Sequence, residues 1–198
     1  RAQGRGPLAV KDFYALVDEI ADLPEPDRQA AERRLRERFE VERAVLVLDM
    51  SEFSLSVRRS GIVAHLCLIR RVQRLAAPIV ASHGGEVLKC EADNVFAVFA
   101  EPRDAVEAAL EINRALTGAA QPGTAGPPPA VGIGIDFGKV LLIPGRDAFG
   151  DAVNIAHKLG EDVARGGEIL VSDATRERLG ECPAEPLSLS VSGLPFGS

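Results

Sequence analysis

The sequence predicts an α+β fold, an α/β sandwich with a ferredoxin-like βαββαβ core that follows an N-terminal pair of helices. An apolar run of strand length at 45–48 and strand-like segments at 86–89 and 95–99 are flanked by longer segments with apolar residues at helical spacing. Strand-like runs also occur in pairs with only a few residues between them, which is typical of hairpins. The 198 residues hold one domain of ordinary size plus an appendage, and a second full enzyme domain would not fit.

The appendage is a helical segment that we assign to residues 1–44. Apolar residues recur at helical spacing over 8–23, and Pro24 and Pro26 end that pattern before a highly charged second helix over 27–39. This second helix carries a narrow apolar stripe, made of Ala31, Leu35 and Phe39. Such a stripe packs on a partner helix or a neighbouring domain, while a solvated helix with one face on the core is an equally open interpretation.

Residues 45–198 form the second predicted domain. Its elements are, in chain order, a strand at 45–48, a helix at about 61–83, strands at 86–89 and 95–99, a helix at 102–116, strands at 131–136 and 139–143, a helix at about 149–163, a strand at 168–172 and a short helix at 173–179. Residues 117–130 are rich in Gly, Ala and Pro and predict a mobile loop. The chain stops at Ser198 as a last strand begins, so we expect the domain to continue beyond it.

Two aspartates lie in matching places at strand ends. Asp49 ends the run 45–48, and Asp93 falls in the turn between the strands at 86–89 and 95–99. Neighbouring carboxylates at the rim of a sheet repel unless a hard cation neutralises them, and Mg²⁺ held by one or two carboxylates completes its shell with substrate phosphates. The pair therefore favours a two-metal site for phosphoryl or nucleotidyl transfer. On these residues alone, Asp49 as a strand cap and Asp93 as a turn residue stay open as alternatives.

Four segments of the chain carry a resemblance to a known family. They are LDMSEFS at 48–54, GGEVLKCEAD at 84–93, VGIGIDFGKV at 131–140 and DAFGDAVNIAHKL at 147–159. In this order they resemble the class III nucleotidyl cyclases, the adenylyl and guanylyl cyclases, and the likeness runs from about Val45 to the C-terminus. The resemblance implies the ferredoxin-like core and an enzyme that makes a cyclic nucleotide and pyrophosphate from a nucleoside triphosphate.

The resemblance also implies a metal centre. Asp49 and Asp93 would hold two Mg²⁺ or Mn²⁺ ions, assisted by the backbone carbonyl of Met50. One ion would lower the pKa of the ribose 3′-hydroxyl so that it can attack, and the other would neutralise the triphosphate as pyrophosphate leaves. Phe53 and Ser54, in the loop that follows, would contact the substrate.

Four further residues correspond to the family's nucleotide-binding positions. Lys89 and Asp147 would read the purine, since a cation donates to ring N1 and a carboxylate accepts from the 6-amino group of adenine. Guanine presents the reverse pattern, so this pair favours ATP. Asn154 would orient the ribose, and Lys158 would stabilise charge on the transferring phosphoryl group. Taken alone, Lys89 is also explained as a surface lysine and Asp147 as a turn residue.

Three residues depart from the family pattern. Lys158 stands where the family usually has an arginine, and an ammonium cannot reproduce the bidentate fork of a guanidinium. Glu52 and Ala92 each replace a glycine, which adds charge or removes backbone freedom near the phosphates. The departures leave open a second function, a degenerate cyclase homology domain that binds nucleotide or dimerises and regulates an attached domain.

Composition limits the partners. The net charge of −6 argues against a nucleic-acid-binding surface, because phosphate backbones select for clustered positive charge. No apolar run approaches the length needed to span a bilayer, and three widely spaced cysteines fit reduced thiols in a cytoplasm. The family resemblance implies a head-to-tail homodimer, in which one protomer supplies the aspartates and the other supplies the nucleotide-binding residues. We also expect further regulatory domains in the full-length protein.

Overall fold

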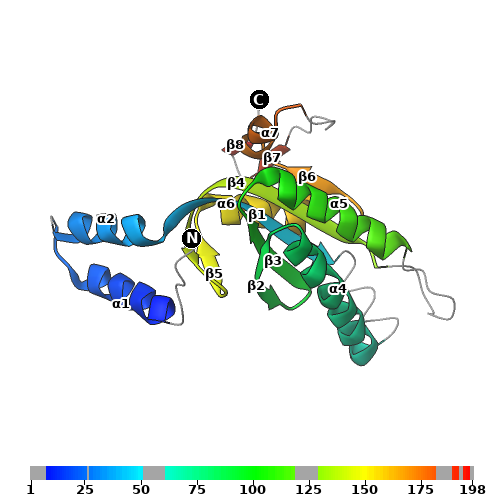
Figure 1. Ribbon diagram of the computed structural model, residues 1–198, viewed down its shortest axis with the longest axis horizontal. Helices are drawn as coiled ribbons and strands as arrows, with labels where there is room; N and C mark the ends of the chain where they lie inside the picture. The colour runs from blue at the N-terminus through cyan, green and yellow to red at the C-terminus, as the bar shows by residue number, and fades with distance from the viewer. Residues whose placement is uncertain are drawn as a thin grey trace.

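A curled six-stranded sheet with helices on both faces forms the body of the computed structural model (Figure 1). The structure describes residues 8–25, 27–50, 61–118, 129–181, 189–191 and 194–196. The core elements are β1 (Glu40–Met50), α4 (Ile62–Ser82), β2 (Glu86–Glu91), β3 (Asn94–Phe99), α5 (Pro102–Gly118) and β4 (Val131–Ile143). Their spatial order β2-β3-β1-β4, with every neighbouring pair antiparallel, confirms the predicted ferredoxin-like βαββαβ core.

Strand β1 lies at the centre of the sheet. Leu48 faces Val95 of β3 on one side and Ile133 of β4 on the other. The strand begins at Glu40, earlier than the predicted start at Val45, because Glu40 already pairs with Leu141 of β4. The charged residues before Val45 concealed this extension. The predicted boundary between residues 44 and 45 therefore falls inside a strand.

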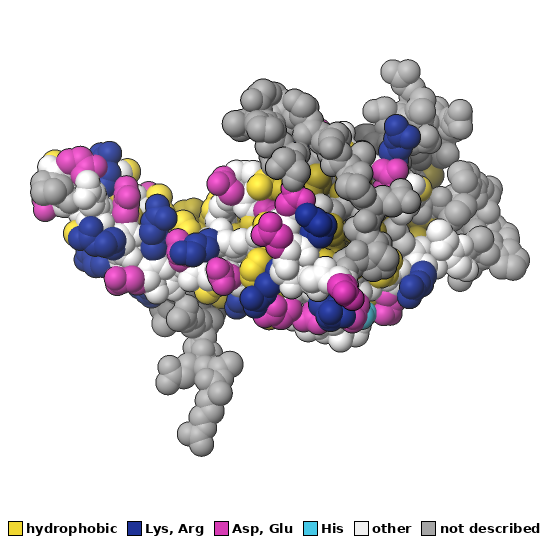
Figure 2. Space-filling model, turned by 90° about the horizontal axis from the view of Figure 1, so that it is seen from above, with side chains coloured by type: hydrophobic (Ala, Val, Ile, Leu, Met, Phe, Trp, Pro, Cys, Tyr) yellow, Lys and Arg dark blue, Asp and Glu magenta, His cyan; other side chains and the backbone are white. Residues whose placement is uncertain are grey.

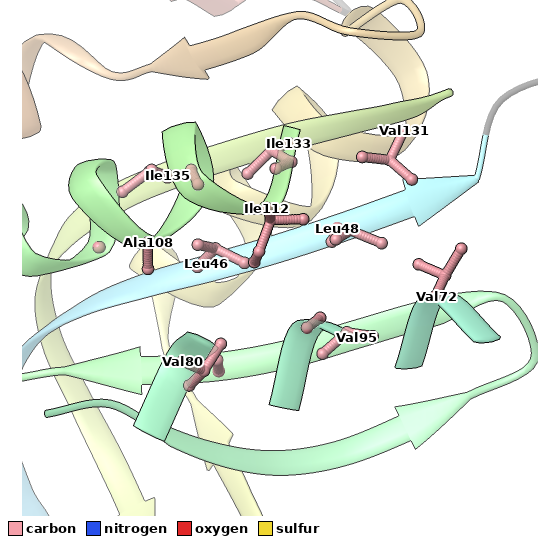
Figure 3. Close-up of a cluster of buried hydrophobic side chains, with 14 of the residues drawn as sticks. Leu46, Leu48, Val72, Val80, Val95, Ala108, Ile112, Val131, Ile133 and Ile135 are labelled. Atoms are coloured by element: carbon pink, nitrogen blue, oxygen red, sulfur yellow. The ribbon is translucent and has the colours of Figure 1, made fainter. Parts of the chain in front are cut away.

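The alternation of side chains along β1 separates the two faces of the sheet. Leu46 and Leu48 pack with α4 and α5, as Figure 3 shows. Val45 and Val47 pack on the opposite face, with the first turns of α6 (Asp151–His157). From Ala44 to Leu48 both faces of β1 are buried, which explains why this part of the strand is an uninterrupted apolar run.

Between residues 131 and 163 the structure differs from the predicted elements in three ways. The two strands predicted at 131–136 and 139–143 are the single strand β4, because Phe137 and Gly138 continue the ladder by pairing with β1. A further strand, β5 (Asp147–Phe149), was missed, and it pairs with the end of β4. The helix predicted at 149–163 consequently starts later, as α6, and ends in the π-helix η1 (Lys158–Val163).

Close packing accompanies the change from α6 to η1. The Ala164 N–H donates to the Leu159 carbonyl at 2.8 Å, a hydrogen bond across five residues. A Cβ atom on Gly160 would lie 2.7 Å from the Val47 carbonyl oxygen, and one on Gly134 would clash with the backbone of Ala156. Glycines therefore let this helical segment rest directly on β1 and β4.

The N-terminal helices α1 (Leu8–Asp22) and α2 (Asp27–Phe39) confirm the predicted pair and project from one end of the sheet (Figure 1). The predicted stripe on α2 is buried, and two of its members, Leu35 and Phe39, cluster with Phe13 of α1 and Ile143 of β4. The stripe thus packs on its partner helix and on the sheet. On the face seen in Figure 2, acidic and basic side chains intermingle over this pair.

The C-terminal part adds β6 (Ile169–Val171), which runs parallel to β4, then α7 (Asp173–Leu179) and the hairpin of β7 (Leu189–Val191) with β8 (Leu194–Phe196). Most of the predicted loop 117–130 lies outside the described residues. Among the described residues, every helix is too short or too polar to cross a membrane.

Candidate functional site

Asp49 and Asp93 come together at one end of the sheet. Asp49 pairs with Gly132 of β4 near the end of β1, and Asp93 sits in the turn that joins β2 to β3. Burial raises the pKa of Asp49 to about 7, with smaller contributions from the negative charges of Asp93 and Glu161. A proton or a cation is therefore needed here to make the partly buried carboxylate stable.

Glu161 is a third carboxylate at this place, and the sequence analysis missed it. It comes from η1, where its Oε1 accepts a hydrogen bond from the Asn94 side chain and lies 3.0 Å from His157 Nε2. Burial raises the pKa of Glu161, while His157 and Asn94 oppose the rise. The spacing of His157 and Glu161 on one helical face was visible in the sequence, but their approach to Asn94 depends on the fold.

The residues present fit a divalent cation bound through oxygen. Asp49 and Asp93 lie close together, and burial destabilises the charged form of Asp49. Carboxylate oxygens are ligands that Mg²⁺ and Mn²⁺ prefer. Within the described part of the chain, no three His, Cys, Asp or Glu side chains are placed to hold one ion. The Met50 side chain is buried in the core, which leaves its backbone as the group available for binding. Such a site must be completed by ligands from elsewhere, for which substrate phosphates are suited.

Lys89 and Asp147 form an ion pair between the two edges of the sheet. Lys89 on β2 places its Nζ 3.1 Å from Asp147 Oδ1 on β5, although these strands stand at opposite ends of the strand order. The sheet curls so that β2 and β5 approach each other (Figure 1). Lys89 also lies over the Phe96 ring, 5.1 Å from its centroid, and 3.6 Å from Glu91. Strand β5, which the sequence did not reveal, is what brings Asp147 to Lys89.

Asn154 and Lys158 lie one helical turn apart. Asn154 is exposed on α6, and Lys158 at the start of η1 pairs with Asp162. Among the described residues, no hydrogen bond or ion pair joins either of them to Asp49 or Asp93. The other two predicted site residues, Phe53 and Ser54, lie outside the described residues.

Sequence comparison gives two curated relatives. "Putative adenylate cyclase 3" of Rhizobium meliloti is 28% identical over 134 residues, which are 68% of this chain and 22% of the relative. An uncharacterized protein of Mycobacterium tuberculosis is 33% identical over 130 residues, 64% of this chain and 46% of the relative. The chain thus spans less than half the length of either. No protein-family model matches it.

Structure comparison identifies the fold. An adenylate/guanylate cyclase/hydrolase from Silicibacter pomeroyi superposes with a TM-score of 0.62 at 28% identity, over 79% of this chain and 94% of that one. The catalytic core of a rhodopsin-guanylyl cyclase with converted specificity, in complex with ATPαS, gives a TM-score of 0.69 at 22% identity, over 80% and 92%. The resemblance to the class III adenylyl and guanylyl cyclase catalytic domains is confirmed, and the chain has their fold.

Proposed function

We propose that this chain is the catalytic domain of an adenylyl cyclase, which converts ATP to cyclic AMP and pyrophosphate. The observation that carries the proposal is the meeting of Asp49 with Asp93 on the fold of nucleotidyl cyclases, because burial and mutual repulsion make Asp49 a poor carboxylate without a counter-ion. The ion pair of Lys89 with Asp147 supports the same assignment from a second place on the sheet.

Asp49 and Asp93 would bind two Mg²⁺ or Mn²⁺ ions, with the Met50 carbonyl as a further ligand. When bound, the ions would supply activation of the ribose 3′-hydroxyl and neutralisation of the triphosphate. In the reaction the 3′-oxygen bonds to the α-phosphorus, the bond from that phosphorus to the bridging oxygen breaks, and pyrophosphate leaves. The hydroxyl proton passes to water.

Lys89 and Asp147 would choose the base. The Lys89 ammonium donates to N1 of adenine, and the Asp147 carboxylate accepts from its 6-amino group. In the free protein these two side chains satisfy each other at 3.1 Å, so adenine would enter between partners that are already neighbours. Guanine offers a donor at N1 and an acceptor at position 6, which would oppose both side chains.

Asn154 and Lys158 would act across a head-to-tail homodimer. Asn154 would orient the ribose and Lys158 would stabilise charge on the transferring phosphoryl group, both facing the aspartates of the other protomer. The exposure of Asn154 in the single chain supports this arrangement, since its amide is available to a ligand. We further propose that the domain belongs to a longer cytoplasmic protein with regulatory domains, which the greater length of both curated relatives supports.

One observation favours a second function, a regulatory module without turnover. Lys158 is already paired with Asp162 four residues along its own helix, and a lysine lacks the planar fork of arginine. If Lys158 stays paired with Asp162, the protomer would bind nucleotide but would not stabilise the charge on the transferring phosphoryl group. The domain would then regulate an attached one.

The deciding experiment is an assay of cyclic product. The purified domain is incubated with ATP or GTP and Mn²⁺, beside Asp93→Ala and a control, Asp22→Ala, at an exposed position of α1. We expect cyclic AMP to exceed cyclic GMP, with the Asp93→Ala product at background and the Asp22→Ala rate unchanged. A folded dimer that binds ATP but forms neither cyclic nucleotide would establish the regulatory module instead.

A further inference from the structure

The turn that carries Asp93 has an unusual backbone. Ala92, directly before Asp93, has a φ of 49°, and it is the one non-glycine residue with positive φ in the part of the chain that the structure describes. An L-residue is strained in this left-handed region because its Cβ approaches the neighbouring carbonyl oxygen. Something must hold the turn in this conformation, since alanine does not favour it.

Gln73 of α4 contacts this turn directly. Its Nε2 donates to the Ala92 carbonyl oxygen at 3.2 Å, and its side chain is buried, with 7% exposed. Arg70 Nη1 donates a hydrogen bond to Gln73 Oε1 at 2.7 Å. Rotating the Gln73 amide by 180° would lose this hydrogen bond, because a guanidinium has no acceptor for the amide N–H. Arg70 therefore fixes the Gln73 amide with its N–H directed at the Ala92 carbonyl.

A second hydrogen bond holds the same hairpin from the other face of the sheet. Asn94, directly after Asp93, donates to Glu161 of η1. The turn is thus attached to α4 through Ala92 and to η1 through Asn94, and Asp93 lies between the two attachments. A buried polar side chain such as Gln73 is stable only when it is hydrogen-bonded, so its contact with the turn is also a condition of its own burial.

We infer that Gln73 is a positioning residue for Asp93. By holding the Ala92 carbonyl it fixes the peptide plane between Ala92 and Asp93, and this plane sets the direction in which the Asp93 carboxylate leaves the backbone. Asp93 is thereby kept beside Asp49. The consequence for cation binding rests on the proposed function, whereas the restraint on the turn does not.

The test compares Gln73→Met with a control on the same helix. Methionine keeps the length of the side chain but donates no hydrogen bond, while Val80→Ala removes buried volume from α4 about two helical turns away from Gln73. Two quantities are measured: hydrogen exchange of the backbone amides of residues 91–94 without metal, and Mn²⁺ affinity from the paramagnetic resonance of free Mn²⁺. We expect Gln73→Met to exchange faster and to bind Mn²⁺ about tenfold more weakly. Val80→Ala should lower Tm and leave both quantities unchanged.

A rescue variant separates positioning from general stability. Glycine adopts positive φ without strain, so Ala92→Gly in the Gln73→Met background lets the turn keep its conformation without the hydrogen bond. We expect the double variant to recover Mn²⁺ affinity to within about twofold of the wild type. Wild-type affinity in Gln73→Met, or no recovery in the double variant, overturns the assignment.

The proposed metal site can fail separately. The two-metal function is wrong if the wild-type protein does not bind Mn²⁺, or if Asp93→Ala binds Mn²⁺ as well as the wild type does. In that case the hydrogen-exchange measurement alone tests whether Gln73 positions the turn. Equal exchange of residues 91–94 in the wild type and in Gln73→Met would then refute the positioning role, and faster exchange in Gln73→Met would support it.

Discussion

Phe13 of α1 stacks on Phe149 at the end of β5, with ring centroids 5.7 Å apart and ring planes 10° from parallel. Phe39 closes the cluster edge-on, 5.0 Å from Phe13. Strand β5 also carries Asp147, two residues before Phe149 and paired with Lys89. The N-terminal helices therefore rest on the strand that presents a proposed purine-binding residue.

Replacing Phe13 tests how firmly these helices are attached. Phe13 is 4% exposed, and Phe13→Ala should lower the free energy of unfolding by about 3 kcal/mol, because a buried aromatic ring is lost and a cavity is left. Urea unfolding measures the change. Tyr14→Ala, at a neighbouring position that is 41% exposed, should change stability by less than about 1 kcal/mol. Equal losses in the two variants would mean that α1 does not dock on β5 in solution.

A buried carboxyl group should make stability depend on pH. Asp136 of β4 is 3% exposed, and burial raises its pKa above the ordinary 3.8, while the hydrogen bond from Ser172 opposes the rise. The folded chain thus holds the proton more tightly than the unfolded chain. The free energy of unfolding should fall as pH rises from about 4 through the folded pKa, by about 1.4 kcal/mol for each unit that separates the two pKa values.

Asp136→Asn removes this ionisation and keeps an oxygen that accepts from Ser172. Urea unfolding between pH 4.5 and 7.5 should show the wild type losing stability relative to Asp136→Asn as pH rises. Asp22→Asn, at an exposed position of α1, serves as the control and should follow the wild-type curve. A constant difference between Asp136→Asn and the wild type across this range would show that Asp136 has the same pKa in both states.

The core could be predicted because its local signals are strong. The apolar run before Asp49 lies within strand β1, and the glycine pair Gly84-Gly85 follows the end of helix α4, as predicted. Gly85 is also required by packing, since a Cβ atom there would clash with the Phe99 ring. Local pattern and tertiary packing agree at these positions.

The rest depends on contacts between distant segments. Phe137 and Gly138 suggest a turn, yet pairing with β1 keeps them in a continuous strand. Strand β5 has three residues, too few for any periodicity to be detected. Glu161 reaches the vicinity of Asp49 because the helix widens into η1 over glycines, and this widening has no signal in the sequence. The sequence therefore predicted the two aspartates but not their third carboxylate.

Removing one aspartate of the proposed metal site should abolish turnover without unfolding the protein. Asp49→Ala should reduce cyclic AMP formation more than about a hundredfold, since a ligand of the proposed ions is lost. Because the raised pKa of Asp49, about 7, disfavours its charged form, the metal-free variant should be no less stable than the wild type, and its relative stability should grow between pH 4 and 7. Thermal melts in chelator test this. Retained cyclase activity would defeat the two-metal assignment.

Lys158→Arg should raise turnover. A planar guanidinium matches phosphate oxygens better than an ammonium, and a tenfold gain would correspond to about 1.4 kcal/mol of transition-state stabilisation. Lys158 is paired with Asp162, so Asp162→Asn provides a companion variant in which the cation is released. The kcat of each variant is measured with ATP at saturation. An unchanged or lower rate for Lys158→Arg would show that this side chain does not meet the transferring phosphate.

Complementation between two inactive variants tests the shared site. In a head-to-tail dimer the aspartates come from one protomer and Asn154 from the other, so each homodimer holds two composite sites. An Asp93→Ala protomer paired with an Asn154→Ala protomer has one site with both defects and one intact site. With random mixing about half of the dimers are mixed and each has one of two sites working, so the mixture should recover about a quarter of wild-type activity.

The complementation result distinguishes a shared site from a self-contained one only if subunits exchange. Differently tagged protomers that copurify after mixing establish exchange, and a mixture of Asp93→Ala with Asp49→Ala is the matched control. Both control defects fall on the aspartate side, so every dimer in that mixture lacks an intact site and should stay inactive. Recovery in the first mixture alone requires Asp93 and Asn154 to act from different chains. If both mixtures stay inactive although the subunits exchange, the aspartates and Asn154 do not form a site across two protomers. That result would favour the regulatory or monomeric alternative.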